Sequence, residues 1–231
     1  MLFLSRLKLE QCHNSYIASF KEIMVQFIQA QNVGLAYLEE KFSLQVAEDD
    51  AFFTEWFENL PEITDLEKQH LDRIKLHFLR LVKRPPLSEE TVKLVVLSPL
   101  LNLAGFYDEP FYMRGEESIE ISAEDEGEII RGRIDVLVIQ EQFWLLVIES
   151  KRSSFSLLEA VPQALVYMLA NPNQDKPTFG LVTNGSDFIF LKLTKQNQPK
   201  YAMSDQFTLL KRKSELYQVL SVLKNLSQIL S

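Results

Sequence analysis

Residues 131–151, RGRIDVLVIQEQFWLLVIESK, restrict the fold of this chain more than any other segment. Two apolar runs are joined by a short polar turn, a pattern that predicts two β-strands in a hairpin. Strands with nearly continuous apolar sequence are typical of a sheet that is buried on both faces. The chain must therefore cover both sides of this sheet, and helices can provide that cover.

Three ionisable residues interrupt these apolar runs. Asp135 lies within the first strand, and Glu149 and Lys151 end the second. Side chains two apart on a strand point the same way, so Glu149 and Lys151 share a face, and a hairpin could bring Asp135 beside them. Two carboxylates and an ammonium at one sheet edge indicate a site. The alternative is a buried Glu149–Lys151 ion pair, with Asp135 a separate charge near the turn.

Composition is that of an ordinary globular protein. Hydrophobic residues make up 46% of 231 positions and charged residues 24%, which suits one large domain or two small ones. No apolar run approaches the ~20 residues that span a bilayer. The N-terminus becomes charged too early for a secretory signal, and the single cysteine, Cys12, excludes an internal disulfide. We expect a cytoplasmic protein with no membrane segment.

Charge is distributed unevenly along the chain. The formal net charge of −8 counts against a nucleic-acid binder, which usually has a basic footprint. Seven acidic residues fall within residues 116–128, whereas residues 192–213 contain six lysines and arginines against Asp205 alone. The basic segment is either a set of solvated lysines or a wall that contacts phosphate beside the site.

The first part of the chain, residues 1–86, is predicted to be helical. Its expected elements are an apolar helical stripe over residues 16–28, a short helix capped by Asp50, and a longer helix that begins at a Thr64–Glu67 capping box and ends near Val82. Pro85-Pro86 is the best internal boundary. We therefore predict an N-terminal helical region, residues 1–86, and a core with a C-terminal helix, residues 87–231.

The second part mixes helices and strands. A helix should begin at Ser88 and end near Gly105, with Pro99 kinking it or ending its regular part. The remaining expected elements are strands over 118–121, 129–139 and 143–150, a helix over 156–169 that opens with a Ser156–Glu159 capping box, strands over 179–183 and 188–193, and a helix over 214–230. This order predicts an α/β (mixed α+β) fold, with a central mixed sheet flanked by helices.

Magnesium is the cation that best suits the paired carboxylates. Mg²⁺ takes oxygen ligands, keeps several waters and needs only one or two protein carboxylates; Mn²⁺ is the alternative. Asp135 and Glu149 would be the ligands, and the carbonyl of Ser150 could add another. Lys151 would orient or deprotonate a metal-bound water and offset charge on a phosphoryl group.

Two further features add to this constellation. Glu89 lies three, seven and eleven residues before Val92, Val96 and Leu100, so it points along the buried stripe of its helix; the alternative is a carboxylate that only favours the helix N-terminus. Gln163 and Tyr167 lie four apart on one face of the next helix. The alternative is that Gln163 lies on the surface and Tyr167 packs in the core, with no role in a site.

Together these residues resemble the PD-(D/E)xK nuclease superfamily, and most closely the N-terminal nuclease domain of type I restriction R subunits. The pattern S-E-E-T-V-K-x5-P-L-L-x3-G over residues 88–105 looks like that family's E-x3-R-x5-P-L-L-x2-G, with Lys93 in the basic position. Gln163 and Tyr167 match its Q-x3-Y pair, and residues 181–185 resemble its strand ending in T-N-G. The likeness covers about residues 88–193.

The resemblance implies a restriction-endonuclease-like core and a Mg²⁺-dependent endonuclease that hydrolyses DNA; residues 1–86 would then be an N-terminal helical extension of that core. By that resemblance Asp135 and Glu149 bind the metal, Lys151 is catalytic and Glu89 completes the site. Gln163 and Tyr167 support the site and contact DNA near it. Ile134 stands where the motif has proline, and the chain has neither the P-loop nor the helicase motor of full R subunits.

Three functions remain open at this point. The first is a stand-alone nuclease, in which Arg133 and Arg131 contact the DNA backbone or merely balance the acidic hairpin. The second is a module of the same fold that binds nucleic acid with little or no turnover inside a larger restriction or defence assembly. The third is a helical adaptor that works through residues 1–86. Expected partners are DNA and either a second copy of the chain, in a homodimer, or restriction-system subunits.

Overall fold

The computed structural model describes residues 26–84, 87–122, 127–140, 143–151, 156–213 and 215–231. Its first elements are β1 (Gln26–Gln29), η1 (Ala30–Asn32), α2 (Leu35–Phe42), β2 (Gln45–Val46), η2 (Asp50–Phe53), α3 (Asp65–Val82), α4 (Glu89–Val92), η3 (Lys93–Leu97) and α5 (Ser98–Leu103). They are followed by β3 (Tyr112–Ser122), β4 (Glu128–Gln140), β5 (Phe143–Ser150), α6 (Leu157–Leu169), β6 (Thr178–Thr183), β7 (Asp187–Thr194), β8 (Lys200–Met203), β9 (Phe207–Thr208) and α7 (Leu216–Leu230).

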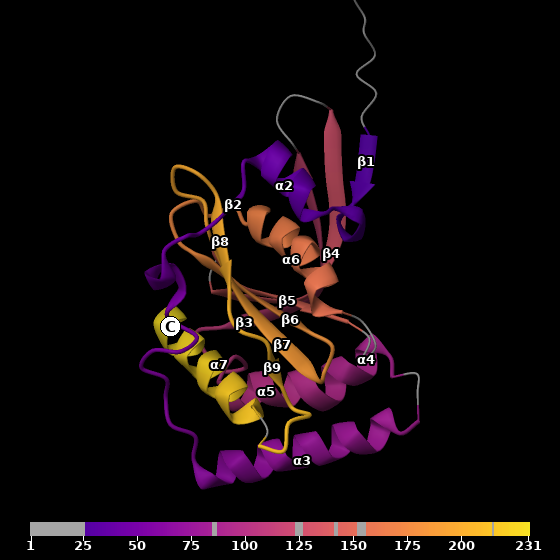
Figure 1. The fold of residues 1–231 in the computed structure, drawn as a ribbon, viewed down its shortest axis with the longest axis vertical. Coiled ribbons are helices and arrows are strands. Elements are labelled where there is room, and N and C mark those ends of the chain that lie inside the picture. The colour runs from indigo at the N-terminus through magenta and orange to yellow at the C-terminus, as the bar shows by residue number, and fades with distance from the viewer. Residues whose placement is uncertain (1–25, 85–86, 123–126, 141–142, 152–155, 214) are drawn as a thin grey trace, which may run out of the picture.

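The strands form a mixed sheet in the order β1-β4-β5-β6-β7-β8-β2, with β3 paired to β4 and β9 paired to β7 (Figure 1). β3, β4 and β5 are antiparallel neighbours, as the sequence predicted. α6 then carries the chain across the sheet, so β5 and β6 run parallel. The mixed α/β class with helices on the sheet is confirmed.

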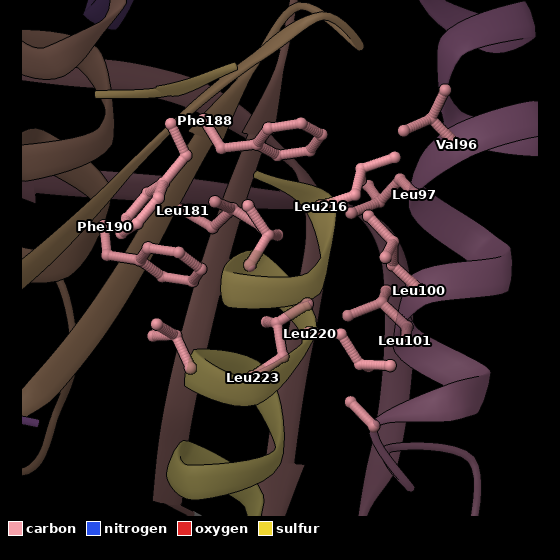
Figure 2. Packing of buried hydrophobic residues seen from close by; sticks show 14 of the residues in the cluster. Val96, Leu97, Leu100, Leu101, Leu181, Phe188, Phe190, Leu216, Leu220 and Leu223 are labelled. Atoms are coloured by element: carbon pink, nitrogen blue, oxygen red, sulfur yellow. The ribbon is translucent and has the colours of Figure 1, made fainter. Parts of the chain in front are cut away.

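Helices cover both faces of this sheet. β6 shows the alternation, because Phe179 and Leu181 pack into one core and Val182 into the other. The first core lies under η3, α5 and α7, and the second lies under α6 and α2. Figure 2 shows how the first is filled: leucines of α7 point between the aromatic rings of β7 and the leucines of η3 and α5. This two-sided burial is what the apolar strands predicted.

Local signals placed several helix ends correctly. The Thr64–Glu67 capping box opens α3, and Ser88 caps α4 through a hydrogen bond to the N–H of Thr91. Ser156 precedes α6, but its side chain caps nothing, so the predicted capping box is absent there. Asp49, rather than the predicted Asp50, caps η2.

Pro99 disturbs its helix on the N-terminal side. It has no N–H to donate to the preceding turn. Directly before it, η3 is a π-helix, in which the N–H of Ser98 bonds the carbonyl of Lys93. Pro99 was predicted to kink this helix or to end its regular part; the α-helical hydrogen-bond pattern is interrupted by one π-helical turn directly before it.

The predicted N-terminal helical extension is not seen among the described residues, although the helix predicted from Thr64 to Val82 is present as α3. Phe27 and Ile28, expected on a helical stripe, lie in β1, which pairs in parallel with β4; β2 pairs with β8. A short apolar segment is compatible with the periodicity of a helix or of a strand, and pairing with β4 makes this one a strand. Residues 16–25 of the stripe and Pro85-Pro86 lie outside the described residues, and the division of the chain at residue 86 stays a prediction.

The strands β8 and β9 were also missed. Both are short, and they lie in the basic segment that was read only for its charge. Within the described ranges, no helix is both long and apolar enough to cross a membrane.

Gly185 joins β6 to β7 at a place where a side chain does not fit. Its φ is +86°, and a Cβ there would lie 2.8 Å from Phe78 of α3 and 3.0 Å from Val92 of α4. We expect Gly185→Ala to lower the free energy of unfolding by roughly 1–2 kcal/mol from the left-handed backbone alone, and further from the overlap. Denaturant unfolding measures this loss.

The matched control is Gly34→Ala. Gly34 has a φ of −100°, and a Cβ there would meet nothing within 4 Å. Equal stability losses in the two variants would contradict the packing argument for Gly185.

Candidate active site

The site is created where β4 and β5 separate. Their ladder has its last pair at Val136 and Ile148, and Asp135 and Glu149 are the next residues on the two strands. β5 continues beside β6, where Glu149 pairs with Val182, and the N–H of Lys151 donates to the carbonyl of Thr183 at 2.7 Å. The two carboxylates therefore stand on neighbouring strands at a gap, with Lys151 held at the end of β6.

A cavity of about 340 Å³ opens at this gap. Seven of the predicted site residues line it: Glu89, Arg133, Asp135, Glu149, Lys151, Gln163 and Tyr167. Sequence reasoning missed most of the other wall, which contains Gln29, Ala30 and Gln31 of the β1–η1 corner and Gly132; Arg131, considered as a possible DNA contact, also lines it. The carbonyl of Ser150 as a further metal ligand stays a prediction.

Each of the two strand carboxylates has a lysine partner. Lys151 Nζ lies 2.5 Å from Glu149 Oε1, and Lys93 Nζ lies 2.9 Å from Asp135 Oδ1. Burial lowers the pKa of Lys93, but the hydrogen bond and charge of Asp135 outweigh it, so the pKa is raised. The Glu149–Lys151 ion pair, which was the alternative to a functional site, is present. A second ion pair, between Lys93 and Asp135, was not predicted from the sequence.

Glu149 is the most constrained group in the cavity. It is 2% exposed, and its Oε2 has no hydrogen-bond partner among the described residues. Burial first, and then the charge of Asp135, raise the pKa of Glu149 to about 7, although Lys151 opposes them. Burying a carboxylate oxygen without a hydrogen-bond donor costs free energy, and binding a cation or a proton would reduce that cost.

A polarised hydrogen-bond chain holds Lys151. Its ammonium has only donors, so Gln163 must present Oε1, at 2.8 Å, and turn its amide nitrogen away. That Nε2 donates to the hydroxyl of Tyr167 at 2.6 Å. Gln163 is buried, so the surface reading of this residue was wrong. The four-residue spacing on α6 thus fixes Lys151 from a second element.

Tyr167 lies against β4 because Gly132 leaves room for it. A Cβ on Gly132 would lie 2.5 Å from the Tyr167 ring and 2.8 Å from Ala30. Burial, and then the charge of Glu149, raise the pKa of Tyr167 to about 12, so its hydroxyl stays neutral. The only sequence signal for this contact was a glycine inside an apolar strand, which marks a close approach.

Glu89 and Lys93 reach the cavity from one helical face, a single turn apart. Glu89 is half-buried and Glu90 is exposed, as their positions relative to the apolar stripe predicted. The charge of Glu89 contributes to the raised pKa of Glu149, so the two carboxylates share one electrostatic environment.

The two arginines before Asp135 pair with acids of β3. Arg133 is exposed and lies 3.2 Å from Glu116, and Arg131 Nε lies 2.7 Å from Glu120. Arg131 also stacks over Phe27 of β1, with its guanidinium 3.5 Å from the ring centroid. Both arginines thus balance the acidic hairpin, which was one of their two predicted roles.

The donor set fits a hard divalent cation. Asp135 and Glu149 offer carboxylate oxygens, and Glu149 Oε2 is buried and unbonded in the described part of the chain. No cluster of three His, Cys, Asp or Glu side chains close enough to enclose a metal is found among the described residues. Mg²⁺ does not require such a cage, because it keeps waters and binds through one or two carboxylates.

No protein-family model and no curated protein matches the chain. Among solved structures, it resembles the fragment structure of a protein assigned as an HsdR subunit of a type I restriction enzyme from Vibrio vulnificus YJ016, with 19% sequence identity and a TM-score of 0.38. The match covers 53% of this chain and 24% of that one, so this chain spans about a quarter of its length. A TM-score this low carries no functional argument.

The raised pKa of Glu149 predicts a pH-dependent stability effect in the metal-free protein. Ionisation is disfavoured in the folded state, so this group supports folding fully below its ordinary pKa of 4.5, and that support is lost as the pH rises through about 7. Glu149→Gln cannot ionise. We expect it to raise the melting temperature relative to wild type at about pH 8, and by much less at about pH 5.

Thermal unfolding in chelator measures this difference. Glu40→Gln makes the same charge change at an exposed position and serves as the control. A Glu149→Gln difference that is the same at both pH values would contradict a buried, ionisation-resistant carboxyl.

Proposed function

We propose that this chain is a metal-dependent nuclease that hydrolyses DNA phosphodiester bonds. One observation carries the proposal: Asp135, Glu149 and Lys151 line one cavity with Glu89, and a buried oxygen of Glu149 lacks a donor among the described residues. The resemblance of residues 88–193 to the PD-(D/E)xK pattern supports the same reaction. Its expected partners are DNA and either a second copy of the chain or restriction-system subunits.

Mg²⁺, or Mn²⁺ in its place, would be held by Asp135 and Glu149, with the carbonyl of Ser150 as a further ligand. When bound, such a metal polarises a phosphoryl oxygen and lowers the pKa of a coordinated water. Glu89 adds negative charge to the metal side of the cavity. The acids bring no attraction for DNA by themselves, so the metal charge is also needed to admit the phosphate.

Lys151 would act on the attacking water and on the charge that develops at phosphorus. Its ammonium carries three donors, of which Glu149 and Gln163 receive two. Gln163 is fixed in turn by Tyr167, so the ammonium has little freedom to leave the cavity. This positioning orients a water and offsets negative charge in the transition state. Gln163 and Tyr167 therefore support the site. Arg133, predicted either to contact DNA or to support the site, pairs with Glu116, so we assign it the supporting role.

Alanine variants test the reaction. We expect Asp135→Ala, Glu149→Ala and Lys151→Ala each to reduce Mg²⁺-dependent cleavage of DNA by at least about a hundredfold, because each removes a group that acts on the transition state. Nicking and linearisation of plasmid DNA provide the readout, and circular dichroism checks that the variants fold.

Glu90→Ala is the matched control, because Glu90 is an exposed acid next to Glu89. Unchanged nicking by all three purified site variants would refute the nuclease proposal.

A second function is favoured by one specific contact. Lys93 pairs with Asp135, which is the carboxylate that a metal would need. If this ion pair persists, the cavity stays neutralised by lysines and the chain is a nucleic-acid-binding module of a larger assembly, with little or no turnover. The net charge of −8 also favours a module whose affinity for DNA is supplemented by partner subunits.

Calorimetric titration with Mg²⁺ or Mn²⁺ separates the two functions. For the nuclease, we expect wild type to bind metal and Asp135→Asn to lose that binding. Lys93→Met should bind metal more tightly than wild type, because it removes both a competing cation and its repulsion. No binding by wild type, even with DNA present, would favour the module.

A further inference from the structure

The cations of the candidate site are already neutralised. Lys93 pairs with Asp135, Lys151 with Glu149, Arg131 with Glu120 and Arg133 with Glu116. Glu89 lines the same cavity and adds a further negative charge. Affinity for nucleic acid comes mainly from lysines and arginines that neutralise phosphates. A nuclease with such a site needs phosphate contacts elsewhere on its surface.

The basic segment 192–213 is divided by the fold. Lys192 points inward and lies 2.5 Å from Glu55. Lys195 donates to the carbonyls of Leu169 and Asn171 at the C-terminal end of α6. The ammonium groups of these two lysines therefore bind internal partners, and neither is offered to a ligand in solution. The other end of the segment, residues 211–213, is exposed.

Residues 211–213 form one wall of a groove against α3. The groove has a volume of about 800 Å³. It is lined by four cations, Lys75, Lys211, Arg212 and Lys213, and by Asp72, Glu215, Tyr217 and Gln218. Figure 1 shows the loop before α7 lying over α3, so residues far apart in the sequence meet here. We call this surface the α3–α7 groove.

Contacts within the α3–α7 groove occupy its acids. Tyr217 donates to Asp72 at 2.9 Å, and Lys211 lies 2.6 Å from Glu215, which also accepts from the N–H of Thr208. Arg212 and Lys213 have no ion pair among the described residues, and both are exposed. The groove therefore presents two uncompensated cations to solvent, on a protein whose overall charge is −8.

The loop that carries these cations is anchored at both ends. Leu209 and Leu216 are completely buried, and the N–H of Leu209 donates to the carbonyl of Ser186 at 2.8 Å. Lys75 of α3 donates to the carbonyl of Lys211 at 2.7 Å, which ties the loop to the opposite wall. Cations on an anchored loop lose less conformational entropy on binding a ligand than cations on a free chain.

We propose that the α3–α7 groove binds the phosphodiester backbone of DNA outside the cleavage cavity, with Arg212 and Lys213 as the principal phosphate contacts. This inference rests on the proposed nuclease function and adds the surface that gives an acidic protein its affinity for DNA. The guanidinium of Arg212 suits two phosphate oxygens at once, and Lys213 acts as a point charge. Contacts of this kind fix position on DNA without reading sequence.

Fluorescence anisotropy with a labelled DNA duplex tests the groove. Ca²⁺ in place of Mg²⁺ limits cleavage during the measurement. We expect Arg212→Ala combined with Lys213→Ala to weaken DNA binding about tenfold, and the slope of log affinity against log salt to fall by roughly 1–2, since each lost phosphate contact removes about 0.9. The melting temperature and the calorimetric metal affinity should not change.

The matched control is Lys176→Ala combined with Lys200→Ala. It removes the same charge from exposed positions outside the groove. Equal weakening in the two double variants, or none in either, overturns the groove as a DNA site. Replacement by Arg212→Lys with Lys213→Arg should restore most of the affinity and the salt slope.

The outcomes separate this inference from the nuclease proposal. If wild type cleaves DNA and the groove variant binds DNA normally, the groove assignment fails while the nuclease stands. If wild type neither binds nor cleaves DNA, both fail. If inorganic phosphate saturates the groove of wild type at matched ionic strength while DNA affinity is unaffected by the groove variant, the groove takes small anions and the DNA assignment is overturned.

Discussion

The balance of charge where β4 and β5 separate is the constraint on which the rest of the site depends. Two carboxylates stand next to one another just beyond the last strand pair, Val136 and Ile148. Neither could remain there without cations, and lysines from two directions supply them: Lys93 from η3 and Lys151 from the end of β5 itself. Among the described residues, Glu149 Oε2 has no hydrogen-bond partner, so the lysines compensate the two carboxylates incompletely. The unpartnered oxygen distinguishes the cavity from a simple buried ion pair.

Packing on one face of the sheet gives this arrangement its rigidity. Gly132 admits the ring of Tyr167, Tyr167 fixes Gln163, and Gln163 fixes the ammonium of Lys151. The ammonium of Lys151 and the amide nitrogen of Gln163 can only donate, so both hydrogen bonds run from Lys151 through Gln163 to Tyr167. The β1–η1 corner closes the same wall through Ala30, which would also meet a side chain at Gly132. The geometry of the candidate site and the packing of the core therefore depend on the same residues of α6.

The cavity and the α3–α7 groove differ in their balance of charge. The cavity is lined by three acids and three cations, and each of those cations has an acidic partner. The groove is lined by four cations and two acids, and Arg212 and Lys213 have no ion pair among the described residues. In the proposed nuclease, a bound metal would add positive charge where the phosphate is expected to enter the cavity. The proposed α3–α7 groove would attract the DNA backbone without a metal. Lys93 pairs with Asp135, where the proposed metal would otherwise supply the positive charge.

The sequence alone determined the mixed α/β class, the hairpin, the helix starts at Thr64 and Ser88, and a candidate set in which Asp135, Glu149, Lys151, Glu89, Gln163 and Tyr167 belong together. The class, the hairpin and the helix starts follow from short-range signals, namely strand patterns, helical spacing and caps. The grouping of the six site residues followed from their resemblance to the PD-(D/E)xK pattern. Only the tertiary structure decided that Phe27 lies in a strand, that Lys93 faces Asp135, that Gln29 and Ala30 complete the cavity, and that Lys192 is half-buried against Glu55 while Lys213 is exposed. Each of these depends on a partner far away in the chain, and the periodicity of a segment carries no information about which distant residue it will meet.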